Sequence, residues 1–407
     1  MKILLVVAYF KPEIGSASHL YFDLAKAFVD LGHNVNILTS YPRSFNLNEN
    51  DVGKTFPLVE TIDGINIYRC RHPTQRDNIV LRGLEHFIIP HYYFKLYKQL
   101  NIKFDVCLMY IPPLPLYYLA RKIKKYDNTR SVLNLQDFHP QELIDVGVIK
   151  NPVLIKFMEF IEREAYKNAD FITVLSRGGV NYIVKRGADP NKIKHIFNGL
   201  MFDDFKQYKE KNDFKEKQDI VDKILVTYVG ILSPYQGIDN ILNVAIKLRE
   251  NDDIVFYIVG DGSNKKHLSK RINKEKISNV KMLPFQSREE YFNIINSSDI
   301  SLVSLDERMK APCLPGKIKD LLAMNQPIIA SVSLDSETAY VIKEAGGIVI
   351  DPGDIEDMTK VIIKLKNNLN RKKKMGNKGW SFFKKNMDLK KIVKYYEQIL
   401  LDLKLQS

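Results

Sequence analysis

The sequence predicts an α/β protein with two doubly wound parallel sheets, one in each half of the chain. Short apolar runs rich in β-branched residues alternate with amphipathic stretches of helical period, which is the pattern of strands joined by crossover helices. The alternation occurs twice, and a polar, charge-dense stretch separates the two series. The chain has 407 residues, 45% of them hydrophobic, which is enough for two packed cores.

The first series predicts a domain over residues 1–205. Its opening apolar run is ended by Lys11, Pro12 and Glu13 too early for a secretory signal, so we expect a buried strand there. The expected strands are Ile3–Ala8, Val35–Thr39, Val106–Tyr110, Val132–Leu135 and Phe171–Val174, and the expected helices are Leu20–Leu31, Pro115–Lys124 and Pro152–Lys167.

The second series predicts a linker over 206–222 and a second domain over 223–386. The tail from Met358 onward is helical and very basic, and we expect a last helix at 387–407 to pack back on the first domain. The expected strands of the second domain are Ile224–Val229, Ile254–Val259, Val280–Leu283, Ile300–Leu305, Ile328–Ala330 and Ile348–Ile350.

Composition narrows the compartment and the partners. The net charge of +13 favours an anionic partner such as a nucleotide, a nucleic acid or an acidic membrane surface. The cysteines, Cys70, Cys107 and Cys313, lack the spacing of a metal site or a disulfide framework, so we expect a reducing, cytoplasmic compartment. No apolar stretch approaches the roughly 18 residues that a membrane-spanning helix needs.

The loops that follow the strands are the expected place of function, because open α/β sheets bind ligands beyond the carboxyl ends of their strands. Gly230 follows one expected strand, and Gly260 and Gly262 follow the next. Glycine lets the backbone approach a ligand closely. The alternative is that these glycines only form tight turns between a strand and a helix.

The segment CLPGKIKDLLAMNQPIIAS points to an anion. Pro315 and Gly316 precede a helix expected to begin near Lys317, so free N–H groups and the helix dipole would face a group such as a diphosphate. Asp320 follows one turn later, where a carboxylate can accept hydrogen bonds from vicinal hydroxyls such as those of ribose. The alternative treats Lys317 and Asp320 as solvated residues of the first turn.

Taken in order, several segments resemble the family 4 retaining glycosyltransferases, whose GT-B fold has two Rossmann-like domains facing each other across a cleft. The family's first strand, glycine loop and first helix resemble YFKPEIGSASH and LAKAFVDLGHNVNILTS, and its turn into the linker resembles ADFITVLS with IKHIFNGLMFDDF. Its donor domain resembles YVGILSPYQGIDNIL, YIVGDGS, VKMLPF and PGKIKDLLAMNQPIIAS. The resemblance covers nearly the whole chain and implies sugar transfer from a nucleoside-diphosphate sugar, expected to be UDP-linked, to a sugar or lipid-linked glycan acceptor.

The resemblance also implies which residues bind the donor. Backbone N–H groups and cations would stabilise the leaving diphosphate, with no metal and no other cofactor. The acidic pair Asp203 and Asp204 lies after the Asn-Gly turn, at the start of the charge-dense connection between the domains, where capping or solvated roles are expected. Glu337 would face the donor sugar or phosphate, unless it only favours a helix dipole. The implied donor-binding residues are Gly15, Gly230, Gln236, Gly237, Asp261, Gly262, Phe285, Pro315, Gly316, Lys317, Asp320 and Glu337.

Two departures from the family pattern narrow the class. Many members carry two glutamates eight positions apart, where this chain has Pro312 and Asp320. Many also place a lysine before the glycine of the donor loop, where this chain has Gln236, so Lys317 is expected to neutralise the diphosphate. Together with QDFHP at 136–140 and DSET at 335–338, these departures resemble the branch with bacterial N-acetylfucosamine transferases of surface-polysaccharide biosynthesis.

On the acceptor side, the candidate catalytic residues are Asp137 and His139. Asp137 lies just past the expected strand Val132–Leu135, where it can orient or deprotonate an acceptor hydroxyl, and His139 competes for that role. The alternative is that Asp137 caps the next turn.

The segment 82–103 mixes aromatic and basic residues and can lie in an anionic lipid interface. Such contact would place the protein at the inner face of the cytoplasmic membrane, and the basic tract Arg371–Lys374 could assist. Packing of the aromatic stripe against the core is the alternative for the segment, and a solvated helical face is the alternative for the tract.

Two other functions compete with glycosyl transfer. A nucleotide-sugar epimerase of the same fold would act without an acceptor. A non-enzymatic nucleic-acid-binding protein would need a recognisable reader motif, and the sequence contains none. We therefore expect no nucleic-acid partner.

Overall fold

The computed structural model describes residues 1–13, 15–43, 47, 51–73, 79–206 and 212–406. The chain divides into two compact units. The first comprises Met1–Ile144, Ile149–Gly199 and Leu389–Ser407, and the second comprises Asp145–Val148 and Leu200–Asp388. Each unit is an α/β layer structure with one parallel or mostly parallel sheet.

The sheet of the first unit has eight strands in the order β3-β4-β2-β1-β5-β6-β7-β8. Every neighbouring pair is parallel except β3 and β4. The strands are β1 (Lys2–Val6), β2 (Asn34–Ser40), β3 (Val59–Ile62), β4 (Ile65–Cys70), β5 (Val106–Ile111), β6 (Arg130–Leu135), β7 (Phe171–Val174) and β8 (Ile193–His195). The helices are α1 (Ser16–Asp30), α2 (Ile79–Leu100), α3 (Tyr117–Asp127), α4 (Gln141–Asp145), α5 (Pro152–Asn168), α6 (Arg177–Val184) and α16 (Leu389–Lys404).

The antiparallel hairpin of β3 and β4 was not expected from the sequence. Asp63 and Gly64 form its turn, and both have positive φ, 50° and 78°. Asp-Gly between two alternating runs is the sequence signal of this kind of two-residue turn. The signal was therefore present in TIDGINI, between the expected strands.

The last helix, α16, packs against α1 of the first unit. Its Tyr396 hydroxyl accepts a hydrogen bond of 2.8 Å from the buried amide of Asn134 on β6. Near its middle, Glu397 lies 2.7 Å from His33, and at its end Lys404 pairs with Asp105 at 3.1 Å. These contacts tie the carboxyl-terminal helix to three separate segments of the first unit.

The aromatic stripe of 82–103 is part of the core of the first unit. The segment lies largely in α2, where Ile89, Tyr93 and Tyr97 are at most 2% exposed. The Tyr93 hydroxyl lies 2.8 Å from Ser40 Oγ at the end of β2, and the Tyr97 hydroxyl donates to Asp127 at 2.6 Å. Core packing, the alternative prediction, therefore accounts for the central side chains of the stripe, and they are not available to a lipid surface. Among the described residues, no helix is long and apolar enough to cross a membrane.

The sheet of the second unit has six parallel strands in the order β11-β10-β9-β12-β13-β14. They are β9 (Ile224–Val229), β10 (Ile254–Val259), β11 (Val280–Leu283), β12 (Ile300–Ser304), β13 (Ile328–Ser331) and β14 (Ile348–Ile350). The helices are α8 (Phe214–Lys217), α9 (Ile238–Lys247), α10 (Lys265–Glu275), α11 (Arg288–Ser297), α12 (Lys317–Ala323), α13 (Glu337–Glu344), α14 (Ile355–Lys366) and α15 (Leu369–Asn386). The four central strands, β10, β9, β12 and β13, are almost wholly buried because helices cover both faces of the sheet.

The boundary between the units lies at Gly199 and Leu200, not after residue 205. The Leu200 N–H donates to Met387 O at 3.0 Å, so the chain enters the second unit beside the end of α15. Within the expected linker, Phe214 and Ile220 are buried, and Phe214 meets Tyr257 edge-on at 5.3 Å, while most of the other described linker residues are exposed. Residues 207–211 lie outside the described part of the chain.

Candidate functional site

Three loops meet at the carboxyl edge of the second sheet. They follow β9, β10 and β12, which are neighbours in the sheet order, and parallel strands end at the same edge. Backbone bonds join the first two loops: Gly230 N–H donates to Val259 O at 2.9 Å, and Leu232 N–H donates to Asp261 O at 2.8 Å. The glycine loops predicted to carry function are therefore neighbours in space.

Gly260 and Gly262 are required by the packing of these two backbones. A Cβ atom on Gly260 would lie 1.8 Å from Gly230 O, and one on Gly262 would lie 2.3 Å from Leu232 O. Both glycines have φ near +150°, a conformation that other residues rarely adopt. The tight-turn alternative thus explains both glycines without a ligand.

Asp261 also has a local role. One carboxylate oxygen accepts from the Gly262 N–H at 2.7 Å, and the other accepts from Lys265 Nζ at 2.7 Å. Burial opposes ionisation of Asp261, but the bonds from Lys265 and Gly262 outweigh it and lower the pKa of this carboxyl. Asp261 thus closes the turn that leads into α10.

Gly230 makes room for Lys317, the first residue of α12. A Cβ atom on Gly230 would lie 2.8 Å from Lys317 Nζ. The ammonium lies 3.7 Å above the centre of the Tyr228 ring and donates to Gln236 Oε1 at 3.3 Å. Gln236, which stands where many relatives were expected to have lysine, is thus in contact with the lysine expected to replace it.

Tyr228 completes this arrangement and was not singled out from the sequence. Its hydroxyl lies 2.8 Å from Gln236 Oε1 and 2.9 Å from Ile231 O, the two acceptors open to it. Both contacts to Gln236 use the amide oxygen, so neither involves its amide nitrogen. Tyr228 is the fifth of the six residues of β9, so its place next to the end of the strand was the one signal that put it beside the loop.

Burial lowers the pKa of Lys317 to about 7, well below the ordinary lysine value of 10.5. The cause is loss of solvent around the ammonium. Lys317 therefore changes charge near neutral pH in the free protein. A phosphate group beside it would favour the charged form and raise this pKa again.

Asp320 is held in place by two neighbours. Its Oδ2 accepts from the Tyr291 hydroxyl at 2.9 Å, and its Oδ1 accepts from Lys319 Nζ at 2.7 Å. The side chain is buried, with 8% of the residue exposed. Asp320 lies one turn after Lys317 on α12, so both candidates predicted from the segment are on one short helix.

The loop before α12 is tied to α13. The Thr338 hydroxyl donates to Cys313 O at 3.0 Å, and Ser336 caps α13 by accepting from Ala339 N–H at 3.1 Å. Glu337, the first residue of α13, is partly exposed next to this tie. The segment containing Pro315 and Glu337 is therefore one connected region.

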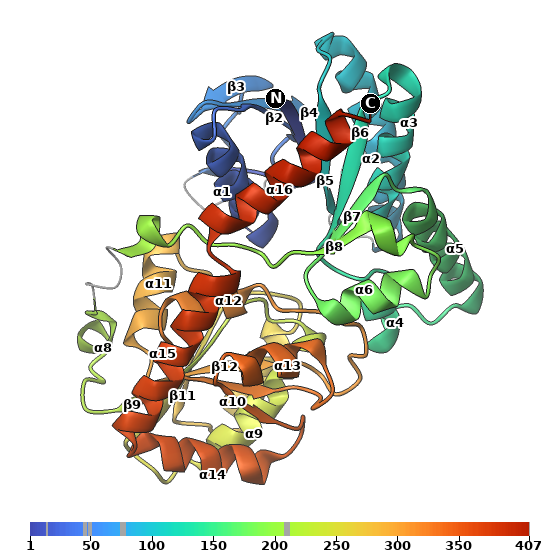
Figure 1. Cartoon of the computed structure of the whole chain (residues 1–407). Coiled ribbons are helices and arrows are strands. Elements are labelled where there is room, and N and C mark those ends of the chain that lie inside the picture. Colours follow the sequence, from blue (N-terminus) through green and yellow to red (C-terminus); the bar gives the residue numbers. More distant parts are fainter. Residues whose placement is uncertain (14, 44–46, 48–50, 74–78, 207–211, 407) are drawn as a thin grey trace. The chain divides into compact units, whose positions relative to one another are not determined.

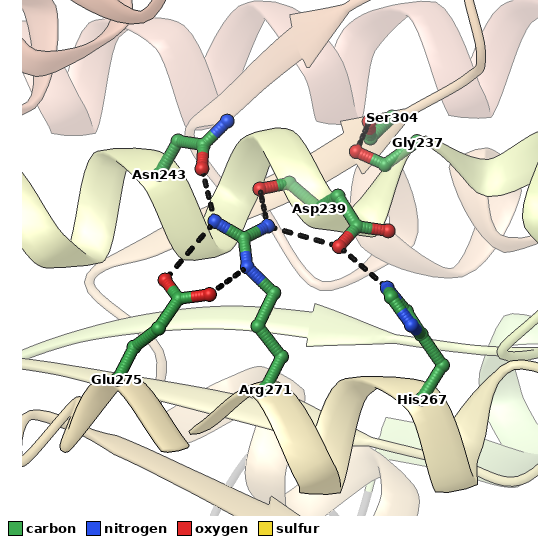
Figure 2. A network of polar contacts seen from close by, with 7 residues as sticks. All are labelled: Gly237, Asp239, Asn243, His267, Arg271, Glu275 and Ser304. Carbon is green, nitrogen blue, oxygen red and sulfur yellow. Dashed lines mark hydrogen bonds and ion pairs between the residues drawn. The ribbon is translucent and has the colours of Figure 1, made fainter. Parts of the chain in front are cut away.

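Gly237 and the helix after it are fixed by a network of polar contacts (Figure 2). Gly237 has φ +58°, and its carbonyl accepts from Ser304 Oγ at 3.2 Å. On α10, Arg271 donates to Asp239 Oδ1 at 2.9 Å, to Asn243 and to Glu275 at 2.8 Å. Arg271 thereby holds the start of α9 against α10, and with it the loop that contains Gln236 and Gly237.

Phe285 follows β11, and its side chain is half exposed. Because β11 is the neighbour of β10, this ring lies at the same sheet edge as the glycine loops. An exposed aromatic face at this edge is suited to stacking on a planar or sugar ring.

In the first unit, Asp137 and His139 follow β6 and are partly exposed. Burial raises the pKa of Asp137, and the nearby His139 opposes this rise. Burial lowers the pKa of His139, and Asp137 opposes this fall. The Phe138 N–H donates to Glu142 at 2.9 Å, so Glu142 supplies the cap of this turn that was the alternative role of Asp137. Burial thus favours the neutral form of both side chains, and each group opposes the shift of the other.

Gly15 precedes α1 with φ +153°, and no heavy atom lies within 4 Å of the position of an added Cβ. The surroundings leave space above this loop. Asp203 is exposed in the single turn Phe202–Phe205. Among the described residues, no three His, Cys, Asp or Glu side chains gather as a metal ion would require.

Comparison with known proteins assigns a known domain family to each of the two units. Residues 19–199 match the glycosyl transferase 4-like domain, and residues 209–381 match the glycosyl transferases group 1 domain. The chain belongs to the glycosyltransferases. The two matched domains cover most of the two units, and the second contains the loops around Lys317.

One curated relative and two solved structures are similar to the chain over most of its length. WcaI of Escherichia coli (strain K12), whose name refers to colanic acid biosynthesis, is 22% identical over 88% of this chain and 90% of its own length. HepE of Anabaena, solved with UDP-glucose, has a TM-score of 0.73 at 14% identity, covering 99% of this chain and all of HepE. Sucrose-phosphate synthase of Thermosynechococcus elongatus has a TM-score of 0.77 at 15% identity over the full length of both chains. The fold of this glycosyltransferase is GT-B.

Proposed function

We propose that this glycosyltransferase moves a sugar, with retention of anomeric configuration, from a UDP-sugar to a glycan or lipid-linked acceptor of surface-polysaccharide biosynthesis. The observation that carries the proposal is the position of Lys317 beneath Gly230 and against Gln236. HepE, of the same fold, was solved with UDP-glucose, and WcaI is named for colanic acid biosynthesis. Both support the substrate class.

Lys317 supplies the charge that the donor loop lacks. Because Gln236 stands in place of a lysine, the donor loop supplies no cation at that position. The Lys317 ammonium, at the start of α12, lies beside the Gln236 side chain instead. In the free enzyme, the lowered pKa keeps much of this lysine neutral, which reduces the cost of burying it. A diphosphate would recharge it, so the positive charge is fullest when the leaving group is bound.

Asp320 is the proposed ligand of the ribose hydroxyls. An ionised carboxylate has about four acceptor positions. Tyr291 and Lys319 use one position on each oxygen, which fixes the orientation of the group and leaves further positions for a diol. Glu337 is proposed to contact the transferred sugar, and Phe285 to stack on the base or the sugar.

Asp137 and His139 are the proposed acceptor-side groups. A carboxyl whose pKa is raised and an imidazole whose pKa is lowered can share the proton that leaves the acceptor hydroxyl. The proposal includes no metal, because backbone N–H groups and Lys317 carry the diphosphate. An N-acetylated amino sugar is the proposed donor sugar, on the resemblance of QDFHP at 136–140 and DSET at 335–338.

A panel of nucleotides and nucleotide sugars tests the proposal. In EDTA, UDP is expected to raise the melting temperature more than GDP or ADP, and the correct UDP-sugar is expected to be slowly hydrolysed to UDP with its anomeric configuration kept. Nuclear magnetic resonance of the released sugar reads the configuration. Conversion of the UDP-sugar to an epimer without UDP release would instead establish the epimerase alternative.

A further inference from the structure

The helix α5 exposes large apolar side chains that its own unit does not cover. Val153, Leu154, Phe157 and Phe160 are 75%, 45%, 51% and 60% exposed. The opposite face of α5 is packed into the first unit through residues such as Ile161 and Tyr166. Single exposed apolar residues are ordinary, but a group of four on one helix marks a contact surface.

These side chains form a stripe along the helix. Val153, Phe157 and Phe160 are spaced by four and three residues, so they project from one side of α5. Phe157 also stacks on Phe87 of α2, with ring centres 6.1 Å apart. The stripe is therefore a continuous apolar surface on a fixed support.

Basic residues border the stripe. Lys156, Arg163 and Lys167 are exposed and recur at intervals of seven and four, so they form a second row beside the apolar one. Lys150 is exposed just before the helix begins. A surface hollow lined by Lys156, Glu159, Phe160 and Arg163 brings two cations next to an exposed ring.

The support does not need a partner to hold its shape. Asn151 caps α5 by accepting from the N–H groups of Val153 and Leu154 at 2.9 and 3.1 Å. At the buried face, Glu162 accepts from Arg186 at 2.9 Å and from the Tyr182 hydroxyl at 2.9 Å. The apolar row is thus presented by a helix that is already anchored, and it is free for another surface.

We propose that α5 is a membrane-docking helix, which lies on an anionic phospholipid bilayer with Val153, Phe157 and Phe160 among the acyl chains. Aromatic and aliphatic side chains beside a row of cations are the composition of helices that lie in the interface of acidic membranes. Exposed cations outnumber the acidic neighbours Glu159 and Glu164, which gives the charge complementarity. This role falls to α5 and not to 82–103, and it does not depend on which sugar or nucleotide the enzyme uses.

Vesicle sedimentation of the full chain tests the proposal. The probes are vesicles of phosphatidylcholine alone and vesicles that also contain phosphatidylglycerol, at low salt. We expect binding to the anionic vesicles, and a loss of about tenfold or more in the variant with Val153→Ser and Phe160→Ser. Ile363→Ser with Leu369→Ser, an exposed apolar pair beside the basic tract of α15, is the control and is expected to bind like the wild type.

A charge pair separates α5 from the rest of the basic surface. Lys156→Glu with Lys167→Glu is expected to abolish binding to anionic vesicles, while Lys373→Glu with Lys374→Glu on α15 retains it. Equal losses in the two pairs would assign binding to overall charge and overturn the proposal. Wild-type protein that binds equally to both vesicle types would also overturn the proposal.

Fluorescence locates the helix without removing an apolar group. Phe160→Trp is expected to shift its emission to shorter wavelength on anionic vesicles and to be quenched by brominated lipid; Trp380 of the second unit is the background. An unshifted emission with bound protein would reject the proposal. If the wild type does not bind vesicles but forms dimers that Val153→Ser with Phe160→Ser dissolves, the face is a self-association surface and the proposal is overturned.

Discussion

Replacing Lys317 by methionine is expected to stabilise the free enzyme and to remove its response to UDP. Methionine keeps most of the volume of the side chain above Tyr228 and beneath Gly230, but it has no charge to bury. The two expected effects have opposite signs. General damage to the fold would lower both the stability of the free enzyme and its response to UDP. A gain in stability together with a loss of the UDP response therefore identifies a ligand-binding cation.

The size of the effect follows from the pKa of Lys317. A fall from 10.5 to about 7 corresponds to about 5 kcal/mol, an upper bound for the cost of keeping the ammonium charged in the folded chain. Lost contacts to Gln236 and Tyr228 offset about 1–2 kcal/mol of this, and relaxation reduces it further, so we expect a net gain of about 1–3 kcal/mol at pH 6.

The lowered pKa of Lys317 in the folded state decides how the stability gain of Lys317→Met changes with pH. Below pH 7 the lysine is charged in both states, and the folded state bears the full cost. Between pH 7 and the ordinary lysine pKa of 10.5 the folded chain loses its proton first, so the cost disappears. The advantage of Lys317→Met should therefore be greatest at pH 6 and vanish near pH 10.

Urea unfolding at pH 6 and pH 9, with and without UDP, measures both effects. Lys343→Met, a replacement of an exposed lysine on α13, is the control and is expected to change neither stability nor the UDP response. A Lys317→Met enzyme that is destabilised at pH 6, or that keeps the UDP response of the wild type, would refute the role given to Lys317.

Three further changes have expected outcomes. Adding Gln236→Lys to the Lys317→Met enzyme should restore part of the UDP response in melting experiments, because the new ammonium can reach the position of the Lys317 ammonium. No recovery would show that a cation at position 236 cannot replace the one at position 317. Arg271→Ala should destabilise the second unit by about 1–3 kcal/mol in urea, and the exposed Arg249→Ala by less than about 0.5 kcal/mol. Equal effects of the two replacements would show that the network of Figure 2 does not hold α9 in place. Asp137→Asn should lower the transfer rate and leave the UDP response intact, and loss of both would place Asp137 on the donor side.

Much of the fold was predictable from the sequence, because strands buried on both faces are short apolar runs with a clear beginning and end. Ile224–Val229, Ile254–Val259 and Phe171–Val174 have the bounds that were expected. The hairpin at Asp63–Gly64 was missed because β3 is a short edge strand and both β3 and β4 are partly polar. In the described part of the linker expected over 206–222, Phe214 and Ile220 are buried within an otherwise mostly exposed, charged segment.

The candidate donor site was predictable in its motifs and not in its contacts. Lys317 and Asp320 were identified from one helix-start pattern, and the structure adds Tyr228 and Tyr291 as their partners. A tyrosine within an apolar strand or helix has no motif, so its role depends on the register between elements. Gly260, which was read as a possible ligand contact, is explained by the closeness of two backbones.

The surface was the least predictable part. In α2 and in α5, apolar residues occur on more than one side of the helix, and the period alone does not show which side is covered. The structure buries Tyr93 and Tyr97 of α2 and exposes Val153 and Phe160 of α5. The difference arises from tertiary packing, which the local sequence does not encode.

The most direct test of the central claim is a count of the protons taken up when UDP binds at pH 8. Calorimetry in two buffers of different ionisation enthalpy gives this number. At pH 8 the terminal phosphate of UDP, which ionises near pH 6 like other phosphate monoesters, is already charged, so it contributes little. With a pKa of about 7, Lys317 is about nine-tenths neutral at pH 8, and the account predicts an uptake of about 0.9 proton by the wild type and none by Lys317→Met. UDP binding without proton uptake in the wild type would contradict it.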